Sequence, residues 1–322
     1  MPINHDISKW KADVAASVDL YNDWFMIFAP KTYRDKRIQV TKDAEAGLLE
    51  TSDLTQITPD VLKAKPSILP MLRMVTCPPL ARDRLMGLAY ADKNLIGCME
   101  AGACPVEMQP GLLNTNLQRI AAIISKLLDR DMFPWLAANV KPTDLERARA
   151  ATIIADRMCG AQSDPIIRNA QEERQLKLIA EYLIRKGYTL KKHTTKRPIT
   201  DMEPGTFAFR MGVKGVQVDK NGVEKKVNIP IDVVIQPHVP RSHRVPILLE
   251  CKSAGDFTNT NKRRKEEATK LVQIHKNPVT AEAEFVLFLC GYFGADYLGY
   301  EASEGIDFIW EHRIMDMDQV GF

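Results

Sequence analysis

The first half of the chain carries apolar residues at three- and four-residue steps, which is the spacing of amphipathic helices. The earliest stripe starts at Trp10 and continues through Tyr21 and Phe28, so we expect a helix that Pro30 ends. Its aromatic side chains are expected in the core rather than stacked on bases. Further helices are predicted at residues 41–50, 59–64, 80–91, 112–129 and 143–159, and no strand is predicted before residue 200.

A long helix is predicted next, opened by Asp164 and Pro165 and ended by Gly187. We place a domain boundary at its start. The predicted organisation is a helical domain at residues 1–163, with a role in clamping DNA or in dimerisation, and a catalytic domain at residues 164–322.

Three largely apolar segments then predict an antiparallel meander. Asn221 and Gly222, between the first two, favour a hairpin turn. The expected fold is α/β (α+β), with a mixed sheet flanked by helices and preceded by a helical N-terminal domain. The predicted strands are 206–219, 225–237 and 245–252, followed by a helix at 261–276, a buried strand at 285–291, a short helix and a final strand.

Charged side chains interrupt the apolar runs of the second and third strands. Asp232 lies in the second, and Glu250 and Lys252 flank Cys251 in the third. Because a strand alternates its faces, Glu250 and Lys252 point to one side and Cys251 to the other. If the two strands pair as a hairpin, Asp232 lies beside Glu250. The alternative is a set of ordinary strand-end charges paired for structural reasons.

Two carboxylates and an ammonium group at one end of a sheet suit metal-dependent hydrolysis of a phosphodiester. Mg2+ prefers oxygen ligands, usually one or two carboxylates with water and phosphate, and Mn2+ can substitute for it. Two acids this close repel each other unless a cation lies between them. We predict Asp232 and Glu250 as metal ligands. Lys252 would hold or activate the attacking water and offset charge on the phosphate.

The arrangement P-x-D…E-x-K, formed here by Pro230, Asp232, Glu250 and Lys252, resembles the signature of the PD-(D/E)xK nuclease superfamily. The run LLECKSAGDFTNTNKRRKEEATK, with TCPPLARDRL and DPIIRNAQEERQL upstream, is similar to the XamI-type type II restriction endonucleases. The resemblance covers most of the chain. Ile231 stands where many members of the superfamily carry a second acid.

The resemblance implies a Mg2+-dependent enzyme that cuts double-stranded DNA at a short, palindromic site by direct hydrolysis, leaving 5′-phosphates. Cutting both strands of a palindrome implies a homodimer. A cognate DNA methyltransferase is expected in the same system, although not as a physical partner.

In the superfamily, a helix ahead of the sheet often adds a further acid, and Glu172 and Glu173 are the candidates here. We assign Glu173 to the predicted metal site, together with the backbone carbonyl of Cys251. Both acids could equally complement the dipole at the start of their helix.

Basic and polar segments outside the strand motif are candidates for DNA contact. The stretch 185–197 holds six Lys or Arg and no acid, and the cations at 262–265 oppose the dipole of the helix they begin, which an anionic partner would relieve. Each segment could instead be a solvated surface, and Arg82 and Arg84 could pair with Asp83. The predicted contacts are Arg82, Arg84, Lys191, Lys192, Ser253, Asn259, Thr260, Asn261, Lys262, Arg263, Arg264 and Lys265.

Composition limits the remaining classes of function. The net charge of +3 over 322 residues means that a DNA-binding surface must be a local patch. The apolar runs are too short for a membrane span, the start lacks a secretion leader, and the six cysteines form no CxxC pair. We expect a cytoplasmic protein without membrane contact or structural zinc. Two alternatives stay open: a less specific repair or phage-defence nuclease, and a non-catalytic DNA-binding protein on the same scaffold.

Overall fold

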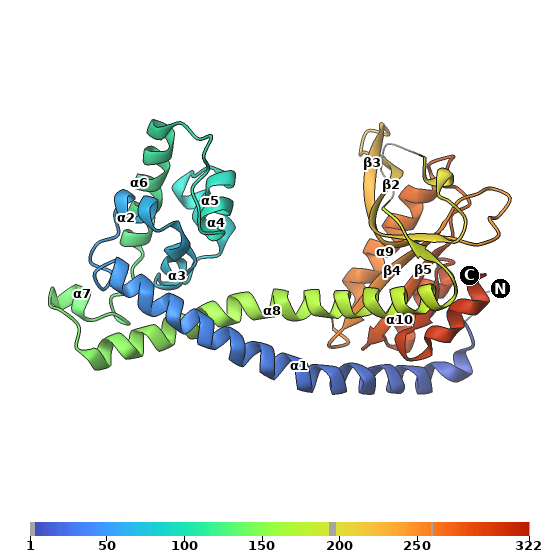
Figure 1. Cartoon of the computed structure of the whole chain (residues 1–322), viewed down its shortest axis with the longest axis horizontal. Coiled ribbons are helices and arrows are strands. Elements are labelled where there is room, and N and C mark those ends of the chain that lie inside the picture. The colour runs from blue at the N-terminus through green and yellow to red at the C-terminus, as the bar shows by residue number, and fades with distance from the viewer. Residues whose placement is uncertain (1–3, 193–197, 259, 322) are drawn as a thin grey trace. The chain divides into compact units, whose positions relative to one another are not determined.

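The computed structural model describes residues 4–192, 198–258 and 260–321, leaving aside the side chains of 261–264. Its contacts divide the chain into two compact units (Figure 1). One, here called the sheet unit, comprises Met1–Phe28 and Arg168–Phe322. The other, the helical unit, comprises Ala29–Ile167. The first 28 residues therefore group with the C-terminal part of the chain, because side chains such as the buried Trp10 pack into its core.

Two long helices contribute residues to both units. Helix α1 spans Ile7–Glu50 with Pro30 inside it, and α8 spans Asp144–Arg185 with Pro165 inside it. The predictions that Pro30 ends a helix and that Asp164-Pro165 opens one were therefore wrong. An interior proline removes one backbone hydrogen bond at a cost of about 3 kcal/mol. Packing on both sides of each proline offsets that cost, since buried residues precede and follow both positions.

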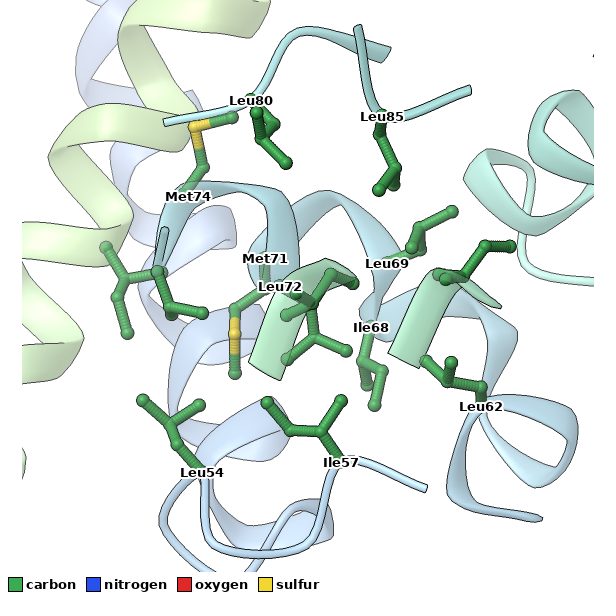
Figure 2. Packing of buried hydrophobic residues seen from close by; sticks show 14 of the residues in the cluster. Leu54, Ile57, Leu62, Ile68, Leu69, Met71, Leu72, Met74, Leu80 and Leu85 are labelled. Atoms are coloured by element: carbon green, nitrogen blue, oxygen red, sulfur yellow. The ribbon is translucent and has the colours of Figure 1, made fainter. Parts of the chain in front are cut away.

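The helical unit is built from short helices around an apolar core. Leu62 and Leu72 are fully buried there, and Figure 2 shows how the Leu, Ile and Met side chains of successive helices converge. The prediction of a helix at 59–64 is confirmed, and those at 80–91 and 112–129 are confirmed with shorter or shifted bounds. The elements are α2 Pro59–Ala64, η1 Pro66–Ile68, α3 Leu69–Met74, α4 Arg82–Ala89, α5 Lys93–Glu100, α6 Pro110–Lys126 and α7 Trp135–Ala138.

The sheet unit contains a mixed sheet of six strands in the order β1-β2-β3-β4-β5-β6. The predicted meander is confirmed, since β2, β3 and β4 pair antiparallel. The other pairs are parallel: β1 with β2, β4 with β5, and β5 with β6. The two-residue strand β1 contradicts the expectation of no strand before residue 200. The strands are β1 Thr189–Leu190, β2 Thr206–Val218, β3 Glu224–Gln236, β4 Ile247–Ala254, β5 Phe285–Gly291 and β6 Asp307–Trp310.

Helices cover both faces of this sheet, which confirms the expected α+β architecture. One face packs on Leu271 of α9 (Thr260–His275), Leu298 of α10 (Ala295–Ser303) and Trp10 of α1. The other packs on the C-terminal half of α8, through Ile179, and on η3 (Glu311–Val320). A short 3-10 helix, η2 (Ile199–Asp201), precedes β2. Within the described ranges, no helix has both the length and the apolar character needed to cross a membrane.

Candidate active site

Asp232 lies one residue beyond the last backbone pair between β3 and β4. That pair joins Val233 to Leu249, so one further step of the same register would set Asp232 opposite Glu250. Oδ2 of Asp232 instead accepts a 2.8 Å hydrogen bond from the backbone N–H of Cys251. The carboxylate thus takes the place of a main-chain acceptor, which fixes the acid against β4.

Glu250 and Lys252 form an ion pair on the side of β4 that faces α9. Nζ of Lys252 lies 3.2 Å from Oε2 of Glu250 and 2.9 Å from Oε1 of Glu267. Nζ of Lys270 lies 2.8 Å from Oε1 of Glu250. Glu250 and Glu267 are only 1% and 0% exposed, so their charges need these cations. The prediction that Glu250 and Lys252 share one side of the strand is confirmed, and Cys251 packs toward the opposite, α8-covered face.

A cavity of about 200 Å³ opens at the end of β4. Helix α8 closes one side through Gln175, whose Oε1 accepts a 3.1 Å hydrogen bond from Oγ of Ser253. Nε2 of Gln175 donates to the carbonyl of Phe288, at 3.3 Å, so this buried amide is held in one orientation. The lining residues are Arg168, Gln171, Glu172, Gln175, Cys251, Lys252, Ser253 and Glu266.

The electrostatic surroundings of Asp232 differ from those of Lys252. Burial, together with the charge of Glu250, raises the pKa of Asp232 to about 6. Burial alone would lower the pKa of Lys252, but the carboxylates of Glu250 and Glu267 outweigh it and raise that pKa above its ordinary value. Burial also raises the pKa of the Cys251 thiol well above its usual range. Lys252 is therefore a firmly charged cation, whereas the charge on Asp232 is costly in the absence of a further cation.

The donors at this site suit a hard divalent cation. Asp232 and Glu250 offer anionic oxygens, and their mutual repulsion is what a bound cation would relieve. Over residues 4–192, 198–258 and 260–321, no three side chains of His, Cys, Asp or Glu are gathered into a ready-made metal site. Mg2+ often takes only one or two protein carboxylates and completes its shell with water and phosphate. The two acids are therefore compatible with such an ion.

Sequence comparison gives this geometry its context. The profile of the XamI restriction endonuclease family matches residues 52–310. The chain belongs to this family. It is 51% identical over 313 residues to the type II restriction enzyme SalI of Streptomyces albus G, with 97% of each chain covered. It is 24% identical over 201 residues to the type II restriction enzyme XamI of Xanthomonas campestris pv. amaranthicola, covering 61% of this chain and 62% of that relative.

Membership of the XamI family at this level of identity makes the chain an enzyme, a type II restriction endonuclease. No solved structure matches the chain. The resemblance to the XamI-type restriction endonucleases noted from the sequence is thus confirmed, while the roles of individual residues depend on the geometry described above.

Glu172 rather than Glu173 is the acid that this XamI-family chain brings to the cavity. Glu172 lines the cavity and contributes to raising the pKa of Asp232, after the larger effects of burial and Glu250. Its Oε1 also lies 3.0 Å from Nη2 of Arg210. Glu173, one residue further along α8, is exposed and does not line the cavity.

Two pairs of predicted DNA contacts are exposed. Arg82 and Arg84 lie at the start of α4 in the helical unit, where Nε of Arg82 is 3.3 Å from Oδ1 of Asp83. Lys191 and Lys192 follow β1 in the sheet unit, and Lys191 forms an ion pair with Glu203.

The other predicted contacts surround the loop between β4 and α9. Ser253 is half-buried on the cavity. Thr260 is 7% exposed, and its hydroxyl donates a 3.0 Å hydrogen bond to the carbonyl of Phe257, so its side chain is used inside the protein. Lys265 is exposed on α9. The remaining predictions, Asn259 and the side chains of Asn261, Lys262, Arg263 and Arg264, lie outside the described residues.

Sequence reasoning missed Glu267 and Lys270 entirely. They lie in a strongly charged stretch of α9, and such a stretch is usually interpreted as a solvent-exposed helix face. A signal was nevertheless present: Glu267 lies four residues before Leu271, and Lys270 four before Ile274, and both apolar residues face the core. Residues four apart share a helix face. Glu267 and Lys270 therefore lie on the same buried face of α9 as these apolar side chains.

Proposed function

We propose that this chain cuts both strands of DNA at a short, palindromic sequence by Mg2+-dependent hydrolysis, leaving 5′-phosphates. The observation that carries the proposal is the meeting of Asp232, Glu250 and Lys252 at the end of β4, joined by the 2.8 Å Asp232–Cys251 hydrogen bond and the 3.2 Å Lys252–Glu250 ion pair. The type II restriction enzymes among its relatives support the same activity.

The order of elements supports a PD-(D/E)xK core. Helix α8, the antiparallel strands β2 to β4, helix α9 and the parallel strand β5 follow one another in the chain. The two acids and the lysine lie on neighbouring antiparallel strands of this core, at the end where β4 continues beyond its pairing with β3.

Each residue of the site has a role that follows from its surroundings. Asp232, Glu250 and the backbone carbonyl of Cys251 would hold the ion, with Glu172 as a further acid in place of Glu173. Bound Mg2+ would offset the charge of the phosphate and activate a water molecule. Lys252 orients that water and stabilises charge developing on the phosphate oxygens. Because the pKa of Lys252 is raised, its side chain stays protonated and is better suited to act as a cation than to remove a proton from the water.

Recognition requires surfaces outside this site. Arg82, Arg84, Lys191, Lys192 and Lys265 are exposed cations that suit contact with the phosphates of double-stranded DNA. Cutting a palindrome on both strands calls for two sites, hence a homodimer, in which the helical unit clamps DNA or joins the subunits. We place the enzyme in the cytoplasm, with a cognate DNA methyltransferase in the same system that does not bind it.

The test is digestion of a large DNA of known sequence by the purified protein with Mg2+, followed by sequencing of the fragment ends. The proposal predicts discrete fragments whose ends share one short palindrome and carry 5′-phosphates. A smear would indicate the less specific nuclease, and DNA that is retained but uncut would indicate a binding protein; either result contradicts the proposal.

A further inference from the structure

A second pair of opposite charges lies against the proposed catalytic residues. Glu267 and Lys270 are three residues apart on α9, so they share the helix face that packs on the sheet. Glu267 contacts Lys252, at 2.9 Å, and Lys270 contacts Glu250, at 2.8 Å. Neither α9 residue belongs to the strand motif, yet each is paired with one of its members.

The four side chains form a row of alternating charge. Lys270, Glu250, Lys252 and Glu267 follow one another at 2.8, 3.2 and 2.9 Å. In the described part of the chain, the fully buried carboxylate of Glu267 has no hydrogen-bond partner besides the Lys252 ion pair. Burying such a charge costs several kcal/mol unless a cation lies beside it. The charge of Glu267 is therefore stabilised by Lys252, and the same ion pair restricts where the Lys252 ammonium can lie.

The same row assigns a different task to Lys270. Its ammonium lies beside Oε1 of Glu250, whereas Oε2 of the same carboxylate faces Lys252. Both oxygens of this proposed metal ligand are thus paired with ammonium groups. A metal ion that binds Glu250 therefore competes with Lys252 or Lys270 for the carboxylate. Of these two lysines, only Lys270 lies outside the strand motif.

We propose that Glu267 and Lys270 are positioning residues: Glu267 holds Lys252 in place, and Lys270 holds the Glu250 carboxylate and weakens divalent-ion binding there. The proposal rests on the assignment of Asp232, Glu250 and Lys252 made above. The competing explanation is a structural ion pair, which well-packed uncharged residues of similar volume often replace without loss.

Glu267→Gln tests the first half. It keeps the shape of the side chain and removes the charge that holds Lys252. The expected result is a fall in kcat of tenfold or more, with little change in KM for DNA or in DNA affinity measured with Ca2+. Glu267→Asp, which keeps the charge, should restore part of kcat. The matched control is Glu282→Gln, which alters an exposed acid and should cut at the wild-type rate.

Lys270→Met tests the second half by a measurement other than cleavage. Without the competing ammonium, the DNA-free enzyme should bind Mn2+ about tenfold more tightly, as read from the electron paramagnetic resonance signal of free Mn2+. Lys276→Met, which alters an exposed lysine just beyond α9, is the control and should leave Mn2+ affinity unchanged. This measurement also decides the proposal if Glu267→Gln does not fold.

Asp232→Asn, assayed alongside, distinguishes an error in the assignment of the catalytic residues from an error in the role of Glu267 and Lys270. If Asp232→Asn cuts at the wild-type rate, the site assignment is wrong and the positioning role is wrong with it. If Asp232→Asn is inactive while Glu267→Gln keeps its kcat, or folded Lys270→Met keeps wild-type Mn2+ affinity, the positioning role alone is overturned.

Discussion

The backbone N–H of Cys251 donates a 2.8 Å hydrogen bond to Oδ2 of Asp232. This bond lies immediately after the last main-chain pair of β3 and β4, between Val233 and Leu249. A side chain on one strand therefore ends the ladder by taking a donor of the other. The consequence is that one carboxylate oxygen is fixed by the backbone, while Glu250 is fixed independently by lysines.

Asp232→Asn distinguishes the role of the Cys251 hydrogen bond from the role of the negative charge on Asp232. The Asn side chain can still accept the Cys251 hydrogen bond, but it cannot offer an anionic oxygen to a metal ion. We expect cleavage to fall by at least about 100-fold, because a charged metal ligand is lost, while DNA is still bound in Ca2+. Single-turnover cleavage and a gel-shift assay measure the two effects. Normal cleavage by Asp232→Asn would show that this acid has no part in the reaction.

The same substitution should stabilise the metal-free protein at neutral pH. The pKa of Asp232 is raised from 3.8 to about 6, and two pKa units correspond to about 3 kcal/mol. Asn carries no charge to bury and no repulsion from Glu250, so the gain should approach this figure. Urea unfolding at pH 7.5 in EDTA measures it. Glu173→Gln, at an exposed position, is the control, and equal stability of Asp232→Asn and wild type would contradict a raised pKa of Asp232.

The pH dependence of wild-type stability follows from the same shift. Below pH 3.8, Asp232 is protonated in both the folded and the unfolded state. Between that value and about 6 the folded protein keeps the proton and the unfolded chain loses it, so the contribution of Asp232 to stability declines as pH rises through this window. The difference in unfolding free energy between Asp232→Asn and wild type should therefore widen from pH 4 to pH 7. A difference that is constant with pH would be inconsistent with a raised pKa.

The sequence was most informative where a charged residue interrupts an apolar segment. Asp232 and Glu250 interrupt apolar runs, so both their strands and their shared location could be predicted. The prolines misled because local backbone rules count the lost hydrogen bond at Pro30 and Pro165 but not the packing around them. Glu267 was missed because its stretch of α9 is strongly charged, although its position four residues before the buried Leu271 distinguishes it from the exposed Glu266.

The rotation of α8 decides between Glu172 and Glu173. Four residues with the i, i+3, i+4, i+7 spacing of one helix face line the cavity, and Glu172 is among them. Glu172 lies four residues before the buried Leu176, so the two share one side of α8, whereas Glu173 points away from it. The four cavity-lining residues of α8 are Arg168, Gln171, Glu172 and Gln175.

Glu172→Gln and Glu173→Gln form a matched pair that tests the choice between these two acids. If Glu172 assists the metal ion, its loss should weaken cleavage about 10- to 100-fold, as loss of outer metal-site partners commonly does, and raise the Mg2+ concentration needed for half-maximal rate. Glu173→Gln should behave as wild type in both respects. The reverse pattern would return the role to Glu173, and two wild-type results would remove α8 from the metal site. Titrating Mg2+ in single-turnover assays distinguishes these outcomes.

Arg84 offers a test of DNA contact by the helical unit that does not depend on the catalytic site. It is exposed at the start of α4, where a phosphate can lie near the helix N-terminus. Each phosphate contact contributes about 0.9 to the slope of log K against log salt concentration. Arg84→Ala should therefore weaken binding to all sequences alike and lower that slope by about one, with the cleavage rate of saturated enzyme unchanged. Fluorescence anisotropy at several salt concentrations, with Ca2+ in place of Mg2+, measures the slope. Arg130→Ala, at an exposed position of the same unit, is the control. If both variants keep the wild-type slope, the contact at Arg84 is excluded, and an equal fall in both would point to a diffuse field of positive charge rather than a defined phosphate contact.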